Sequence, residues 1–238
     1  PSRFTGVALA TFLRTSSLVK TLWKSVSIMP GQIALTRILG PNSLAMPRVI
    51  VMTAPFDAAY ATAPGPPPSR PAWDANGLLG EAPLWDRFWD NPALTKEQHA
   101  QMAAFRSAAA KDLARLAPVL DYGLIHADLV PANVMVNGDA LHFIDFDDGG
   151  YGFRIFELAT FLLRFMDKPD YPDLRTALCE GYSARAEVAS ADLDLFLMLR
   201  AFTYPGWFMD RAGEPNTAAR SARANRTALK LAQAFMER

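Results

Sequence analysis

The chain has 238 residues, of which half are hydrophobic, with 24 basic and 24 acidic side chains and one cysteine. This composition is typical of a folded globular protein, and it excludes a disordered chain and a disulfide scaffold. No apolar run approaches the roughly 20 residues that a membrane span needs. Because the net charge is near zero, there is no general attraction to nucleic acid or to anionic lipid. We therefore expect a cytoplasmic protein with no nucleic-acid partner and no membrane partner.

Acidic residues are almost missing from the first part of the chain. Residues 1–71 hold seven basic residues and a single acid, Asp57. Within this part, only residues 48–52 (RVIVM) have the pattern of a short buried strand. Residues 62–71 contain five prolines and one glycine, which predicts an extended connection rather than a helix or a central strand. The chain is therefore predicted to have three parts: residues 1–61, a Pro-rich linker over 62–71, and a main domain over 72–238.

The main domain begins with an aromatic segment and continues mostly as helices. Residues 73–90 contain three Trp and one Phe, which favours packing in a core over the wall of a pocket. Thr95 and Gln98 form a capping-box pattern ahead of a helix predicted over 96–116. Ser190 and Asn216 are predicted N-caps of later helices. Helical periodicity covers four further ranges, 153–165, 172–185, 191–209 and 217–237.

Between these helices lies a predicted β-hairpin. Two short apolar runs, 134–136 and 140–144, flank the dipeptide Asn137-Gly138. Asn-Gly between apolar runs is the strongest short hairpin signal, because both residues tolerate the positive φ angles of a type I′ turn. A hairpin folds the chain back on itself. We therefore expect the residues after the second strand to return to the start of the first.

That return is expected to gather oxygen-bearing side chains from both ends of the hairpin. Carboxylates a few ångströms apart repel one another unless a proton or a cation lies between them, and an all-oxygen set suits Mg²⁺. Taken alone, the DFD of residues 145–147 also suits the metal-binding motif of a sugar-nucleotide transferase or of a haloacid-dehalogenase-type phosphatase. The predicted set is Asp128, Asn133, Asp145 and Asp147.

The segment just upstream distinguishes among these possibilities. Residues 126–133, HADLVPAN, fit the kinase catalytic-loop pattern H-x-D-L-x-x-x-N, and Asp145 follows Asp128 by 17 residues. With FIDFDDGGYGFRIFELATFL at 143–162, this segment resembles the aminoglycoside phosphotransferase and choline kinase family. It is most similar to the broad phosphotransferase enzyme family, which includes homoserine kinase type II and bacterial stress-response kinases. The resemblance covers residues 70–238. It implies an α+β, protein-kinase-like fold, with a mainly helical C-terminal lobe and a catalytic β-hairpin.

The resemblance also implies a function and assigns roles to residues. It implies transfer of phosphate from ATP, with Mg²⁺, to a hydroxyl group of a small molecule or of a protein Ser or Thr. Asp128 would be the catalytic base. Asn133 would serve both in catalysis and as a metal ligand, Asp145 would be the second metal ligand, and Asp147 would assist at the metal.

Three departures from the family pattern bear on these expectations. Ala127 stands where these enzymes usually have Gly, and Glu157 stands where an Asp is common. Residues 1–71 have no glycine-rich loop and no Glu, and Lys20 is a poor match for the phosphate-binding Lys of a kinase. Residues 1–61 are therefore predicted to be an incomplete or divergent N-terminal lobe. The alternative is a catalytically impaired pseudokinase, or a C-terminal lobe without a complete nucleotide site.

Overall fold

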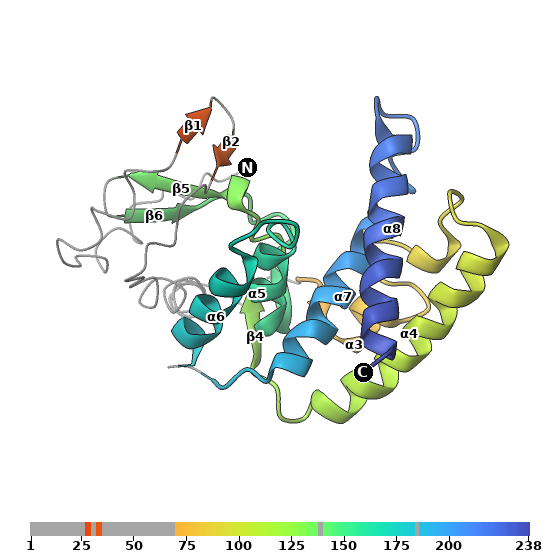
Figure 1. Cartoon of the computed structure of the whole chain (residues 1–238), viewed down its shortest axis with the longest axis horizontal. Coiled ribbons are helices and arrows are strands. Elements are labelled where there is room, and N and C mark those ends of the chain that lie inside the picture. The colour runs from red at the N-terminus through yellow and green to blue at the C-terminus, as the bar shows by residue number, and fades with distance from the viewer. Residues whose placement is uncertain (1–26, 30–31, 35–69, 138–139, 184–185) are drawn as a thin grey trace.

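The computed structural model describes residues 27–29, 32–34, 70–137, 140–183 and 186–238 (Figure 1). Two short strands, β1 (Ser27–Met29) and β2 (Gln32–Ala34), pair in antiparallel fashion, and the sequence patterns did not predict them. The predicted strand over 48–52, Lys20 and most of the linker lie outside the described residues.

The described part of the main domain is mainly helical. The predicted helix over 96–116 is confirmed, and Thr95 and Gln98 form the predicted capping box at its start. α7 begins at Ser190 itself, with Ala189 as its N-cap. Asn216 does precede α8, but at φ 62° and without a side-chain cap. The helices are α3 (Ala75–Leu79), α4 (Lys96–Leu116), α5 (Ile155–Leu162), α6 (Tyr171–Tyr182), α7 (Ser190–Trp207) and α8 (Thr217–Met236), with short 3₁₀ turns η2 (Phe88–Asp90) and η3 (Pro131–Asn133).

A small mixed sheet closes the loop that carries the predicted site. Its strand order is β3-β7-β4, with bounds β3 (Ala72–Trp73), β7 (Gly150–Phe153) and β4 (Tyr122–Ile125). β3 runs parallel to β7, whereas β4 runs antiparallel to it, with Ile125 opposite Gly150. Because those two residues are paired, the chain leaves the sheet at Ile125 and returns to the same place at Gly150. Everything between them forms one closed excursion.

The predicted hairpin lies inside this excursion. β5 (Val134–Asn137) pairs with β6 (Ala140–Phe143) in antiparallel fashion, with Val134 opposite Phe143. This confirms the hairpin, although residues 138–139 of its turn lie outside the described residues. Val134 and Phe143 are buried with Leu129 in a small cluster of their own. That cluster anchors the base of the hairpin to the loop before it.

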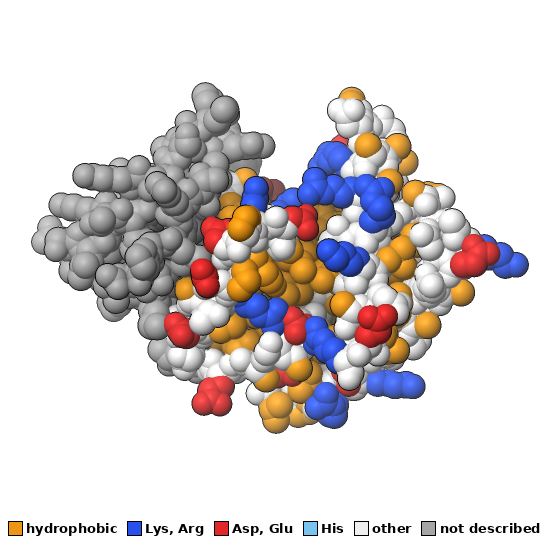
Figure 2. Space-filling view, viewed as in Figure 1, with side chains coloured by type: hydrophobic (Ala, Val, Ile, Leu, Met, Phe, Trp, Pro, Cys, Tyr) orange, Lys and Arg blue, Asp and Glu red, His pale blue; other side chains and the backbone are white. Residues whose placement is uncertain are grey.

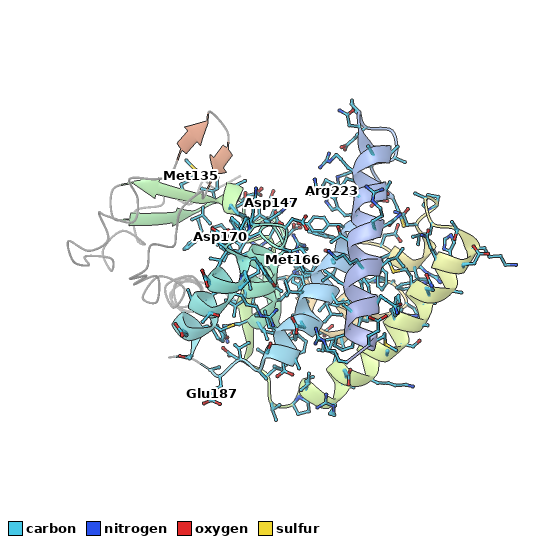
Figure 3. All side chains as sticks on the ribbon, in the orientation of Figure 1. Met135, Asp147, Met166, Asp170, Glu187 and Arg223 are labelled. Carbon is cyan, nitrogen blue, oxygen red and sulfur yellow. The ribbon has the colours of Figure 1, made fainter. Side chains whose placement is uncertain are left out.

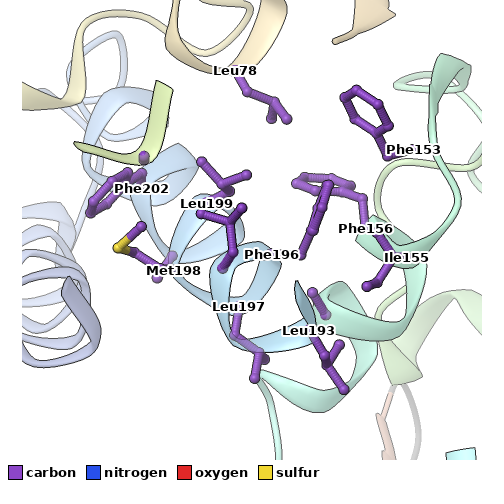
Figure 4. Close-up of a cluster of buried hydrophobic side chains, with 14 of the residues drawn as sticks. Leu78, Phe153, Ile155, Phe156, Leu193, Phe196, Leu197, Met198, Leu199 and Phe202 are labelled. Atoms are coloured by element: carbon purple, nitrogen blue, oxygen red, sulfur yellow. The ribbon is translucent and has the colours of Figure 1, made fainter. Parts of the chain in front are cut away.

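The main core forms where α7 packs between two groups of helices. α7 contacts α5 on one side and α8 on the other, and α4 contacts α8 (Figure 1). Every residue of α5 is buried, which its nearly uniform apolar sequence explains. Figure 4 shows Phe153, Phe156 and Phe196 close together in this core. No helix within the described ranges is both long enough and apolar enough to cross a membrane.

The aromatic segment over 73–90 packs as the sequence predicts. Trp73, Phe88 and Trp89 are buried in the main core, and Phe88 stacks on Phe202 of α7 with ring centroids 4.4 Å apart. Trp85 is only partly buried. Three of the four rings thus stabilise the domain, while Trp85 reaches the edge of the predicted site.

Removing the Phe202 ring tests how much this core contributes to stability. Phe202→Ala is expected to lower the free energy of unfolding by about 3–5 kcal/mol, because the side chain is 1% exposed and its loss leaves a cavity between α7 and η2. Urea denaturation measures the change. Met236→Ala, at a side chain 52% exposed, is the control and should shift stability by about 0.5 kcal/mol or less. A loss below about 1 kcal/mol for Phe202→Ala would contradict the assignment of this ring to the core.

Candidate functional site

The site occupies the excursion between β4 and β7. His126, the first residue after β4, is fully buried and braces the loop with both ring nitrogens. Its Nδ1 lies 3.4 Å from the backbone N–H of Asp128, which donates to it, and its Nε2–H donates to the carbonyl oxygen of Ile144 at 2.9 Å. These two bonds assign the neutral tautomer that carries its proton on Nε2. His126 therefore ties the segment before Asp128 to the segment before Asp145.

Ala127 adopts an unusual backbone conformation that sets the direction of the loop. Its φ angle is 65°, in the left-handed region, which costs a residue with a Cβ roughly 1–2 kcal/mol. Glycine adopts this conformation without that cost, which is a physical reason for the glycine that the resemblance led us to expect here. The backbone N–H of Ala127 donates to Oε1 of Glu157 at 2.8 Å, from α5. That buried acceptor holds the strained turn in place.

Glu157 is a buried carboxyl group, and its burial has a consequence for stability. Burial raises its pKa above the ordinary value of 4.5, although the backbone N–H groups of Ala127 and His126 lower it. Above about pH 4.5 the unfolded state releases this proton while the folded state retains it, so stability falls as pH rises toward the folded pKa. The stabilising effect of the protonated form is fully present only below that range.

Glu157→Gln is expected to remove this pH dependence, because the amide oxygen can still accept from Ala127 while the ionisable proton is gone. The melting temperature of the variant minus that of the wild type should therefore increase between pH 4.5 and pH 7.5. Differential scanning fluorimetry across that range measures it. Parallel curves for the two proteins would contradict the assignment.

Asp128 and Asn133 are held together at the centre of the site. Nδ2 of Asn133 donates to the carbonyl oxygen of Asp128 at 2.9 Å and to its carboxylate oxygen Oδ2 at 3.2 Å. These bonds identify which end of the amide is the nitrogen. No hydrogen bond among the described residues engages the amide oxygen, Oδ1, of Asn133. The motif pair predicted from the sequence is therefore one hydrogen-bonded unit.

Asp145 and Asp147 lie on the segment that follows β6. The N–H of Ile144 donates to the carbonyl oxygen of Asn133 at 3.1 Å, which fixes the start of this segment beside Asn133. Asp145 is exposed, with φ 64°. Asp147 is also exposed, and in Figure 3 it lies between the hairpin and α7. Among the described residues, no hydrogen bond or ion pair joins Asp147 to Asp128 or Asn133.

Asp148 is a third acid of this segment, and it lies closer to Asp128 than the sequence indicated. Burial raises its pKa, the Asp128 and Asp145 carboxylates raise it further, and Arg200 opposes them. The Trp85 side chain also lowers this pKa. The carbonyl oxygen of Asp148 accepts from Nε1 of Trp73 at 2.9 Å. Asp148 thus links the acidic segment to the aromatic segment.

Arg200 of α7 is the site residue that the sequence patterns did not identify. Its Nη2 donates to Oδ1 of Asp128 at 2.6 Å, across 72 positions of sequence. The only available signal was a single charged residue in the apolar run 195–204. Gly206 lets α7 approach the backbone of the aromatic segment, because a Cβ there would lie 1.8 Å from the carbonyl oxygen of Trp85.

The donor set fits a hard cation. Asn133 presents an uncommitted amide oxygen and Asp145 an exposed carboxylate, both oxygen ligands that Mg²⁺ accepts. Magnesium usually takes few protein ligands and completes its shell with water and phosphate oxygens. Within the described ranges, no three His, Cys, Asp or Glu side chains are grouped so that they could hold a metal. A site of one amide and one or two carboxylates is consistent with both observations.

Comparisons with known proteins give the family and the fold of this chain. The model of the phosphotransferase enzyme family (APH) matches residues 17–193. A solved microcompartment-associated aminopropanol kinase has a TM-score of 0.67 and 23% identity, over 88% of this chain and 67% of that one. Amicoumacin kinase in complex with AMP-PNP, Ca²⁺ and Ami has a TM-score of 0.53 and 18% identity, over 78% and 59%. A comparison with curated proteins found no match.

These findings establish the fold and the family. The two solved structures share the kinase fold, and this chain spans 67% and 59% of their lengths. The family match covers well over half of the chain and begins within residues 1–61. It includes the whole excursion from His126 to Gly149 and the Glu157 that supports it. The chain belongs to the phosphotransferase enzyme family.

Proposed function

We propose that this protein transfers the γ-phosphoryl group of ATP to a hydroxyl group of a small molecule, with Asp128 as the base. The observation that carries the proposal is the unit of Asp128 and Asn133, in which one amide nitrogen binds both the backbone and the carboxylate of the acid. Phosphoryl transfer asks the protein mainly to position groups and to neutralise charge. A carboxylate held by its metal-binding neighbour meets the first requirement.

Each side chain of the site has its own role in this proposal. Asp128, whose side chain is 27% exposed, orients the acceptor hydroxyl and receives its proton. The amide oxygen of Asn133 and the carboxylate of Asp145 hold Mg²⁺, and Asp147 assists from its exposed position. Bound Mg²⁺ neutralises the negative charge of the phosphate oxygens. His126 does not transfer a proton in this scheme, because both of its ring nitrogens are used to brace the loop.

The solved relatives support the choice of cofactors and of acceptor class. One was captured with AMP-PNP and a divalent cation, and both are named as kinases of small molecules. An acceptor that carries both an amine and a hydroxyl is therefore the first to test. Protein Ser or Thr remains the second acceptor class.

A competing proposal is a family member that lacks activity. It is motivated by residues 1–71, which contain no Glu and no glycine-rich loop, and of which Lys20 is the nearest match to a phosphate-binding Lys. On this view residues 1–61 form a divergent lobe that does not complete the nucleotide site. The family match, which starts at residue 17, is compatible with both proposals, so a measurement of activity has to separate them.

Transfer of labelled phosphate separates the two proposals. The purified chain is incubated with [γ-³²P]ATP and Mg²⁺, and with a panel of amino alcohols, sugars, hydroxy acids and a Ser/Thr peptide mixture. Labelled product that forms only with Mg²⁺ and one acceptor class supports the kinase and names its substrate class. Failure of every acceptor, together with no binding of ATP, would overturn the kinase proposal in favour of the inactive form.

A further inference from the structure

We propose that Arg200 is the positioning residue for the catalytic base, clamping the Asp128 carboxylate in the orientation that meets the acceptor hydroxyl. This inference rests on the proposed role of Asp128. It adds a part that the motif does not contain, because Arg200 comes from α7, outside the excursion that carries the other site residues.

The guanidinium of Arg200 is entirely enclosed and fixed by directional bonds. Its side chain is 0% exposed. Nη2 donates to Oδ1 of Asp128 at 2.6 Å and to the hydroxyl of Tyr204 at 3.1 Å, and Nη1 donates to Oγ1 of Thr203 at 3.1 Å. Thr203 and Tyr204 lie on α7, as Arg200 does. The helix that carries Arg200 therefore also orients its guanidinium toward Asp128.

Aromatic rings form the rest of the enclosure. The Cζ atom of Arg200 lies 4.7 Å from the ring centroid of Trp85, 4.6 Å from that of Tyr204 and 5.7 Å from that of Phe156. Such rings stabilise a cation through their electron-rich faces and also exclude water. An arginine stays charged even when buried, so this enclosure is favourable only with a carboxylate partner. Asp128 is that partner. Among the described side chains, the only other hydrogen-bond donor to its carboxylate is Asn133.

The carboxylate is thus held from two sides. Arg200 donates to Oδ1, while the amide nitrogen Nδ2 of Asn133 donates to Oδ2. Two bonds to different oxygens fix both the rotamer and the plane of the group. In a loose transition state the base has to orient the hydroxyl more than remove its proton early. A carboxylate that is ion-paired but rigid suits that task. Moving such a catalytic group by about 1 Å can lower the rate roughly 100-fold.

Kinetics of Arg200 variants test the proposal. Arg200→Met should lower kcat per folded molecule by about 100-fold, while KM for ATP stays within about twofold, because the arginine orients the base and does not touch the nucleotide. Arg200→Lys restores the charge without the planar fork and should recover part of the loss. Arg164→Met is the matched control: Arg164 is exposed and lies over the same Tyr204 ring, 5.2 Å from its centroid, and should leave kcat unchanged.

A double-mutant cycle separates positioning from general stability. If Arg200 acts through Asp128, then Asp128→Asn with Arg200→Met should be no slower than Asp128→Asn alone. The inference would be overturned if the rate losses of Asp128→Asn and Arg200→Met multiply in the double variant. It would also be overturned if Arg200→Met has the wild-type kcat per folded molecule. If Arg200→Met does not fold, Tyr204→Phe removes one acceptor of the guanidinium and should lower kcat several-fold with KM for ATP unchanged.

A second readout does not depend on turnover. The NMR signals of the Asn133 side-chain amide report the bond to Oδ2 of Asp128, and they should shift in Arg200→Met but not in Arg164→Met. Unshifted signals would overturn the clamp even if the protein proves inactive. If instead Asp128→Asn retains full activity, the proposed function fails, whatever the amide signals show. The two failures are therefore distinguishable.

Discussion

Asp128→Asn is expected to lower kcat by about 10²–10⁴-fold while leaving the fold and ATP binding intact. The asparagine keeps the shape of the side chain, its single amide oxygen can still accept from Arg200 and its backbone carbonyl from Asn133, but it cannot receive the proton of the acceptor hydroxyl. Steady-state turnover with saturating ATP and acceptor measures the loss. Circular dichroism and a thermal melt show whether the fold is retained.

The control for this experiment is an exposed acid that lies away from the loop. Asp173, exposed on α6, serves this purpose, and Asp173→Asn should turn over at the wild-type rate. Activity that survives Asp128→Asn would contradict the kinase mechanism. It would favour an enzyme that uses the acids of residues 145–147 alone, which is the transferase or phosphatase alternative raised by the sequence.

Asp145→Asn is expected to abolish most of the stabilisation that Mg²⁺ and ATP give the wild-type protein. A ligand at 100 times its Kd stabilises the native state by about 2.7 kcal/mol, and a domain of this size melts about 2–4 °C higher for each kcal/mol. The wild type should therefore melt roughly 5–10 °C higher with both ligands together. Thermal shift with Mg²⁺ alone, ATP alone and both together measures the effect.

The choice of asparagine at this position follows from the backbone. Asp145 has φ 64°, and asparagine tolerates this left-handed conformation better than alanine. Loss of the shift in Asp145→Asn therefore reports a lost ligand charge rather than a strained loop. An equal shift in wild type and variant would contradict the role of Asp145. The absence of any shift in the wild type would favour the form with an incomplete nucleotide site.

Several features of this protein were predictable because they are local. The capping box at Thr95 and Gln98, the helix that follows it and the β5–β6 hairpin each depend on residues a few positions apart. The pairing of Asp128 with Asn133 is equally local, since five positions separate them. Spacing and turn chemistry act at this range, so the sequence contains the whole signal.

One predicted cap was wrong and the other was right in position only. Ser190 is the first residue of α7 rather than its cap, whereas Asn216 is the N-cap of α8 but has φ 62° and makes no capping hydrogen bond through its side chain. Helix ends depend on the contacts of the following turns as well as on the capping residue.

The sequence by itself determined the family motif, the helical lobe, the hairpin and the candidate pair of Asp128 and Asn133. Only the tertiary structure decided what surrounds that pair. Arg200 meets Asp128 across 72 positions, and Glu157 accepts from Ala127 across 30. Neither contact leaves a periodic pattern in the sequence, because the first depends on how α7 packs against the loop and the second on how α5 does. A buried charge needs a partner, and the fold, rather than the local sequence, supplies it.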